Sequence, residues 1–135
     1  MKIIETQVTE AQWEEISKLV IQEDAYIGVD THDVQNILVG KAGVMYQGKE
    51  DASIGYTTFF QNFSKELLTR EQVKNCRYML ISIGNIETDP MDMTDICAIN
   101  DFFEELSPEI EAMWSVFKNK AEDGLTITAI CTNEV

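Results

Sequence analysis

Apolar residues recur along this chain with a helical spacing in some segments and an alternating spacing in others. The clearest helical stripe occupies positions i, i+3, i+4, i+7 and i+11 and consists of Tyr56, Phe59, Phe60, Phe63 and Leu67. A stripe of this kind is far more often a buried helix face than a cofactor site. A second helix is predicted with Asp92 or Thr94 as its cap and Pro108 at its end. Its apolar positions are Ile96, Ile99, Phe103 and Leu106.

A further helix is predicted near the amino terminus, from Glu10 to about Ala25. Thr9 begins a capping box with Gln12, and the apolar residues that follow have helical spacing. This stripe requires a partner surface, either a sheet of the same chain or another subunit. If the helix does not fold back on the domain, we expect an oligomer face formed by Trp13, Ile16 and Val20.

Four segments have the pattern of strands: 41–47, 78–83, 112–118 and 125–131. The run 78–83 is continuously apolar, which favours a strand buried on both faces. The last segment alternates, so Leu125, Ile127, Ala129 and Cys131 should share one face. Helices interleaved with these strands predict an α+β two-layer sandwich, in which a four-stranded mixed sheet carries helices on one face.

The size and composition are those of one folded domain. The chain has 135 residues, of which 44% are hydrophobic and 25% charged. We expect an amino-terminal helical region, residues 1–26, followed by a domain over 27–135, with a single domain overall. The apolar runs are too short to span a membrane, and residues 1–7 do not resemble a secretory signal. The expected location is therefore the cytoplasm.

The charge balance is strongly acidic. Ten Lys and Arg stand against 24 Asp and Glu, which gives a net charge of −14 at pH 7. Between Arg77 and Lys118 there are nine acidic residues and no basic one. Such a surface repels nucleic acids and anionic membranes, so neither is an expected partner. Two interpretations remain: a solvated face that keeps the protein soluble, or a docking face for a basic protein partner.

Metal sites and cofactor sites find little support in the sequence. The three cysteines, Cys76, Cys97 and Cys131, are widely spaced and His32 is the single histidine, so a structural zinc site lacks ligands. We expect all three to be reduced thiols in the core. Three acidic residues, Asp89, Asp92 and Asp95, lack the spacing of a calcium loop, and helix capping explains them better. No metal and no cofactor is predicted.

Motifs for catalysis are equally scarce. The glycines form neither of the common phosphate-binding patterns, and no G-x-S-x-G motif accompanies the single histidine. The protein is therefore not expected to be an enzyme. Asp30 and Asp33, three residues apart at the start of a short helical segment, remain as candidate functional groups. Considered alone, two such carboxylates are best explained as helix caps.

From about Ile27 to Thr132 the chain resembles the carboxyl-terminal domain of FtsZ, the bacterial tubulin-like cell-division protein. Residues 29–34, Val-Asp-Thr-His-Asp-Val, resemble the synergy loop of that family, which typically reads Asn-x-Asp-Phe-Ala-Asp-Val. Residues 42–48 lie where the family has its small-residue strand, and Glu50-Asp51-Ala52 resembles its Gly-Glu-Asp-Arg-Ala stretch. Residues 78–83 and 125–132 are similar to its central and final strands. The resemblance covers about three quarters of the chain, with the elements in order.

This resemblance implies a function at a subunit interface. In the family, two aspartates of the synergy loop reach into the nucleotide site of the neighbouring subunit, and these roles would fall to Asp30 and Asp33. Gly28 replaces the family's leading Asn, and Thr31-His32 replaces its Phe-Ala pair. The candidate interface is therefore Gly28, Asp30, Thr31, His32 and Asp33.

The family's GTP-binding domain has no counterpart in this sequence, so the chain is not expected to bind GTP by itself. The first hypothesis is a non-enzymatic FtsZ-like interaction module that self-associates or binds an FtsZ-type partner of the cell-division or cytoskeletal machinery. The alternative is a repurposed homo-oligomeric domain that binds a small ligand or another protein, with no cytoskeletal role. A homo-oligomer is expected in either case.

Overall fold

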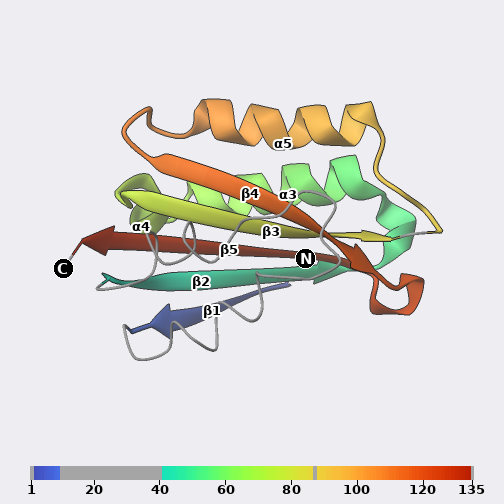
Figure 1. The fold of residues 1–135 in the computed structure, drawn as a ribbon, viewed down its shortest axis with the longest axis horizontal. Helices are drawn as coiled ribbons and strands as arrows, with labels where there is room; N and C mark the ends of the chain where they lie inside the picture. Colours follow the sequence, from blue (N-terminus) through green and yellow to red (C-terminus); the bar gives the residue numbers. More distant parts are fainter. Residues whose placement is uncertain (1, 10–40, 87, 135) are drawn as a thin grey trace.

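The computed structural model describes residues 2–9, 41–86 and 88–134. In these residues, five strands form one sheet in the order β1-β2-β5-β3-β4 (Figure 1). The strands are β1 (Lys2–Val8), β2 (Lys41–Glu50), β3 (Tyr78–Ile86), β4 (Glu111–Asn119) and β5 (Leu125–Glu134). Neighbouring strands are antiparallel except for β3 and β4, which run parallel. The sheet is therefore mixed, as predicted.

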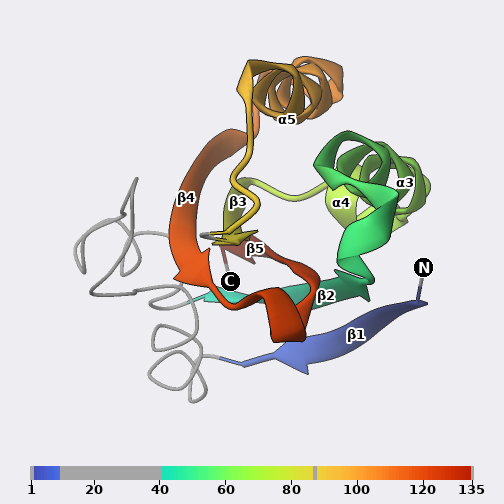
Figure 2. The ribbon, with the colours of Figure 1, turned by 90° about the vertical axis from the view of Figure 1, so that its right-hand side faces the viewer.

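The helices accompany this sheet as a second layer. They are α3 (Tyr56–Leu68), the short α4 (Glu71–Lys74) and α5 (Met93–Glu105), with single 3-10 turns η2 (Ala52–Ile54) and η3 (Ala121–Asp123). Figure 2 shows α3 and α5 side by side on the same face of the sheet, and the two helices contact each other. The predicted α+β two-layer arrangement is confirmed.

Helix α3 is attached to the sheet by the aromatic stripe that the sequence predicts. All five members are buried, with relative exposures of 5% or less: Tyr56, Phe59, Phe60, Phe63 and Leu67. The sheet leaves room for the helix at Gly48, where an added Cβ would lie 2.9 Å from the Phe63 ring. Large side chains on the helix therefore face a glycine on the strand, which lets the two layers approach closely.

Strands β3 and β5 form the centre of the sheet, and β3 is buried along almost its whole length. On β5, Leu125, Ile127, Ala129 and Cys131 belong to the same apolar core as the helices, as their alternation predicts. The intervening Ile130, and its partner Leu80 on β3, point to the opposite face and are also fully buried. The prediction that 78–83 is a strand buried on both faces is confirmed.

Helix α5 begins with a capping box formed by two of the three clustered aspartates. The Asp95 backbone N–H donates to Asp92 Oδ1 at 3.0 Å, and the Asp92 N–H donates to Asp95 Oδ2 at 2.9 Å. The Thr57 hydroxyl donates to Asp95 Oδ1 at 2.7 Å, which connects the first turns of α3 and α5. Asp92 and Asp95 therefore have a structural function, as expected.

Several sequence predictions need correction. The sheet has five described strands instead of four, because β1 was not anticipated. This edge strand exposes residues 4–7, so it lacks the alternating burial from which a strand is predicted. The buried side chains of α5 are Ala98, Ile99 and Phe102, whereas Phe103 and Leu106 of the predicted stripe are only half-buried. The predicted helix over residues 10–25 lies outside the described residues.

Candidate functional site

The residues that the sequence nominates for function lie outside the part of the chain that the structure describes. This applies to the loop residues Gly28, Asp30, Thr31, His32 and Asp33, and to the oligomer-face residues Trp13, Ile16 and Val20. Their roles stay predictions.

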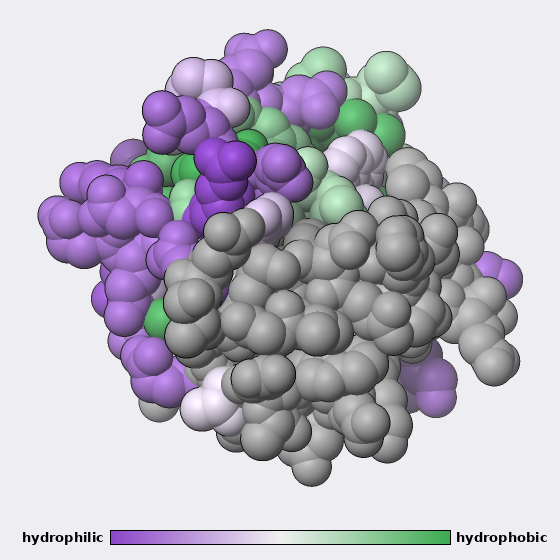
Figure 3. Space-filling view, turned by 60° about the vertical axis from the view of Figure 1, so that its left-hand side comes forward, coloured by the Kyte–Doolittle hydropathy of each residue, from purple (hydrophilic) through white to green (hydrophobic). Residues whose placement is uncertain are grey.

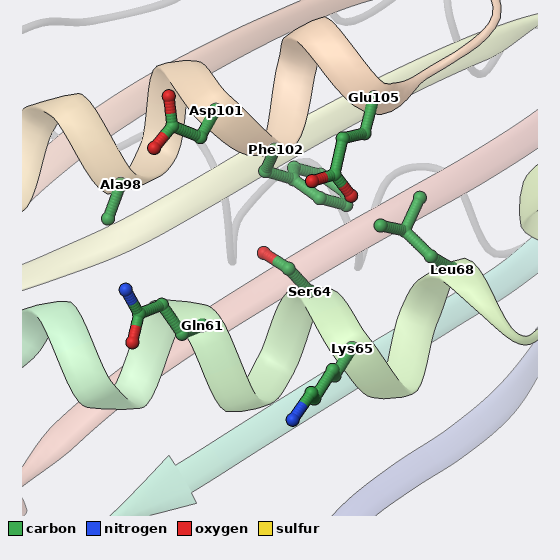
Figure 4. A pocket seen from close by; sticks show the side chains of 8 residues that line it. All are labelled: Gln61, Ser64, Lys65, Leu68, Ala98, Asp101, Phe102 and Glu105. Atoms are coloured by element: carbon green, nitrogen blue, oxygen red, sulfur yellow. The ribbon is translucent and has the colours of Figure 1, made fainter.

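A groove between α3 and α5 is a candidate binding surface (Figure 4). Its volume is about 220 Å³. Four residues of each helix line it: Gln61, Ser64, Lys65 and Leu68 from α3, and Ala98, Asp101, Phe102 and Glu105 from α5. Both sets have the spacing i, i+3, i+4, i+7, so each is one continuous face of its helix.

The groove has an apolar floor and polar sides. Leu68, Ala98 and Phe102 supply the apolar part, and Phe102 also belongs to the core. The Ser64 hydroxyl donates to the Phe60 carbonyl oxygen at 2.8 Å, so it lies against its own helix. Small side chains at Ser64 and Ala98 keep the groove open where the helices face each other. A large residue at either position would fill this space.

The charged groups of the groove differ in direction (Figure 4). The Glu105 carboxylate reaches down beside the Phe102 ring, whereas the Lys65 side chain points away from α5. Asp101, Glu105 and Lys65 are all exposed. Arg70 and Glu66 form an ion pair at 3.7 Å, which involves neither of the groove carboxylates. The groove is therefore acidic on its α5 side.

The surrounding surface is strongly polar. On the side shown in Figure 3, hydrophilic side chains gather on the left of the described surface, and hydrophobic residues gather at its upper right. Among the described residues, the exposed large hydrophobic side chains are Ile4 and Met93. The described helices include none that is long and apolar enough to cross a membrane. A docking partner would therefore meet an acidic, largely polar surface with a local apolar floor.

A second, more open depression lies where the β2–η2 and η3–β5 connections meet. Four acidic residues line it: Glu50, Asp51, Glu122 and Asp123. Asp51 caps η2, because its Oδ1 accepts the Ser53 backbone N–H at 2.8 Å. That hydrogen bond lowers the pKa of Asp51. The described residues contain no group of three His, Cys, Asp or Glu side chains that could hold a metal ion. These connections are best explained as capped turns.

The cysteines divide into a buried pair and an exposed residue. Cys76 and Cys131 are buried and share a hydrogen bond, and Cys76 also donates to the Val73 carbonyl oxygen at 3.3 Å. The hydrogen bond to Cys76, together with burial, raises the pKa of the Cys131 thiol. Cys131 is therefore a protonated core thiol. Cys97 is exposed, so the expectation of three core thiols is wrong for this residue: it lies on the outer side of α5, beside the buried Ala98.

Two buried tyrosines are structural. The Tyr46 hydroxyl donates to Gln72 Oε1 at 3.2 Å, and burial, followed by the nearby Glu5 carboxylate, raises the Tyr46 pKa far above its ordinary value. The Tyr56 hydroxyl accepts the Ile86 N–H at 2.8 Å and donates to the Asp89 carbonyl oxygen at 2.7 Å. Tyr56 thereby connects the start of α3 to the end of β3.

The groove was not predicted from the sequence, although part of the pattern that forms it is visible there. Asp101 and Glu105 lie four residues apart, on the same helix face as Ala98 and Phe102. That spacing predicts a small and acidic stripe beside the buried one. Whether this stripe of α5 faces α3 depends on how the two helices pack, and no local sequence pattern specifies that packing.

The fold is similar to that of solved FtsZ and CetZ structures. The sequence matches no protein-family model, and no curated protein matches it significantly. Among solved structures, the chain is similar to the FtsZ dimer of M. jannaschii, with a TM-score of 0.58 and 14% identity over 84% of this chain. It is also similar to CetZ1 from Haloferax volcanii, a GDP-bound monomer, with a TM-score of 0.50 and 10% identity over 78% of this chain. The chain spans only about a third of those structures, 34% and 33%. At these identities the likeness is one of fold, and the described residues have an FtsZ-like α+β fold.

Proposed function

We propose that this protein is a non-enzymatic interaction module that binds an FtsZ-type partner or a second copy of itself. The observation that carries the proposal is the likeness to FtsZ over 84% of this chain. FtsZ of M. jannaschii is a dimer in the matched structure, so a domain of this fold occurs in a protein that associates with its own kind. Because one fold can serve many functions, binding and turnover have to be measured directly.

The described surface supports binding better than catalysis. The groove between α3 and α5 contains one hydroxyl, Ser64, which donates to its own helix and has no histidine beside it. Two of the three cysteines are buried, and the third, Cys97, has no part in the groove. A groove with an apolar floor and charged sides is the usual anatomy of a protein docking site. A role in cell division or in a cytoskeleton belongs to the same proposal.

The test measures GTP turnover and polymer binding of an FtsZ. Purified M. jannaschii FtsZ is assembled with GTP, with and without this protein, and pelleted. We expect this protein to co-sediment and to change the turnover rate. Asp33→Ala should abolish the change in turnover, because the family resemblance places Asp33 at the partner's nucleotide site. The variant should fold normally, since loss of a helix cap costs only about 1 kcal/mol.

Self-association is tested by light scattering of this protein alone over a range of concentrations. A mass that rises with concentration supports binding to a second copy. A monomer that neither co-sediments nor changes GTP turnover would overturn the proposal and would favour a repurposed domain. A change in turnover that Asp33→Ala leaves intact would refute the synergy-loop role while retaining the partner.

A further inference from the structure

We propose that the groove between α3 and α5 receives a lysine or arginine side chain from a basic segment of a partner protein. This inference rests on the proposed interaction function and specifies where the partner docks and with what chemistry. The support for this inference comes from the size of the groove, its apolar floor, its acidic side and the net charge of the whole chain.

The size of the groove favours one side chain over a metabolite. Pockets for small molecules and cofactors typically measure about 300–1,000 Å³. This groove has about 220 Å³ and is open to solvent along both helices. It therefore accommodates a single long side chain that projects from a segment lying across the two helices.

The lining selects the kind of side chain. An apolar floor of Leu68, Ala98 and Phe102 lies below the carboxylates of Asp101 and Glu105. Lysine and arginine have an apolar stem and a cationic head, so the stem can pack on the floor while the head reaches the carboxylates. Lys65, the one basic residue that lines the groove, points away from α5 and does not occupy this position.

Long-range charge favours the same kind of partner. The stretch from 78 to 117, which includes α5, contains nine acidic residues and no basic one. A basic segment is steered toward such a surface, whereas an acidic one is repelled. A second copy of this chain also carries a net charge of −14, so it is a poor occupant of this groove. The occupant is therefore a basic segment of a different protein.

The experiment uses the full chain and a fluorescent helical peptide. The peptide is alanine-rich and carries arginine at every fourth position. A control peptide replaces each arginine by citrulline, which has nearly the same shape but no charge. Anisotropy gives the dissociation constants, and amide NMR shifts locate the peptide. We expect only the arginine peptide to bind, with shifts centred on Ser64, Ala98, Phe102 and Glu105.

Matched variants distinguish binding at the groove from a general attraction to the acidic surface. The double variant Asp101→Asn with Glu105→Gln should weaken binding about fivefold to tenfold, as expected for two exposed ion pairs. The control variant Glu104→Gln with Glu109→Gln removes the same charge from exposed positions outside the groove and should weaken it less than about twofold. Equal losses in both variants would overturn the proposal, because binding would then depend on net charge alone.

A third variant tests the cavity itself. Ala98→Leu fills the floor without changing charge and should weaken binding more than about tenfold, with thermal unfolding measured to confirm that the variant folds. If it does not fold, the charge variants decide. FtsZ that co-sediments equally with the wild type and the Asp101/Glu105 variant would refute the groove while leaving the proposed function intact. Peptide binding at the groove without any FtsZ binding would refute only the FtsZ-type partner.

Discussion

Helices α3 and α5 have the same length and cover the same face of the sheet, but they differ in what they bury and what they expose. Each has 13 residues; α3 buries five of them and α5 buries three. In α3 one lysine balances one glutamate, whereas α5 carries four acidic residues and no basic one. The first helix mainly anchors the layer, and the second mainly provides its charged surface. Anchoring and recognition are thus assigned to different helices of one layer.

The largest expected effect comes from removing an anchor of α3. Phe59→Ala should lower the free energy of unfolding by about 3–5 kcal/mol, because Phe59 is fully buried between α3 and the sheet. Phe103→Ala in α5 is the matched comparison and should cost clearly less, since Phe103 is only half-buried. Urea denaturation followed by circular dichroism measures both. Equal losses would contradict the division between the two helices.

The next effect concerns the residue that precedes α3. Gly55 has φ 82° and ψ 153°, a conformation that is essentially restricted to glycine. Gly55→Ala should therefore cost roughly 1–3 kcal/mol through backbone strain. No heavy atom lies within 4 Å of the added Cβ, so a steric clash contributes nothing. A variant as stable as the wild type in thermal denaturation would refute the strain.

The start of α5 is stabilised by capping side chains, whereas the start of α3 requires a glycine. Asp92→Ala removes the capping box and should lower stability by about 1 kcal/mol. Asp92→Asn retains an oxygen acceptor and should recover most of that loss. Hydrogen exchange of the first-turn amides of α5 should become faster in the alanine variant. Unchanged exchange would show that the first turn is fixed by its contact with Thr57 instead.

The smallest effect on stability appears only at alkaline pH and comes from Tyr46, which lies in the core beneath the helices. The pKa of Tyr46 is raised in the folded protein above its unfolded value near 10. The unfolded chain therefore ionises first, and stability is fully present below pH 10 and falls as the pH rises above it. The loss should reach roughly 1 kcal/mol near about pH 10.5. Tyr46→Phe should remove this part of the pH dependence in urea titrations.

The fold was predictable where burial and local chemistry agree. The stripe of α3 has five large residues on one face, and all five are buried. The alternation of β5 and the cap of α5 were predictable for similar reasons. Strand β1 was not, because an exposed edge strand imposes no apolar alternation on its sequence. The buried face of α5 was also only partly predicted. An apolar face that includes Ile96 overlaps a second face that includes Phe102, and only packing on the sheet determines which of them is buried.

The candidate site was less predictable than the fold. Its acidic half was visible as a stretch without a single basic residue, and this suggested a basic partner. The groove itself depends on small side chains, Ser64 of α3 and Ala98 of α5, at places where these two helices face each other, and β3 separates the helices along the chain. How the two helices come together is a tertiary property. Cys97 was mispredicted for the same reason: it is exposed, whereas the next residue of the helix faces the core.

The position of β5 has a consequence for the synthesis of the protein. Although it follows every other described strand in the chain, β5 lies between β2 and β3 in the sheet and pairs with both. Until residues 125–134 have left the ribosome, β2 and β3 have no strand between them, and the apolar side chains meant for the core stay exposed. A nascent chain of this protein must therefore wait for its last described strand before it can fold. Chaperones that bind apolar segments would meet it during that interval.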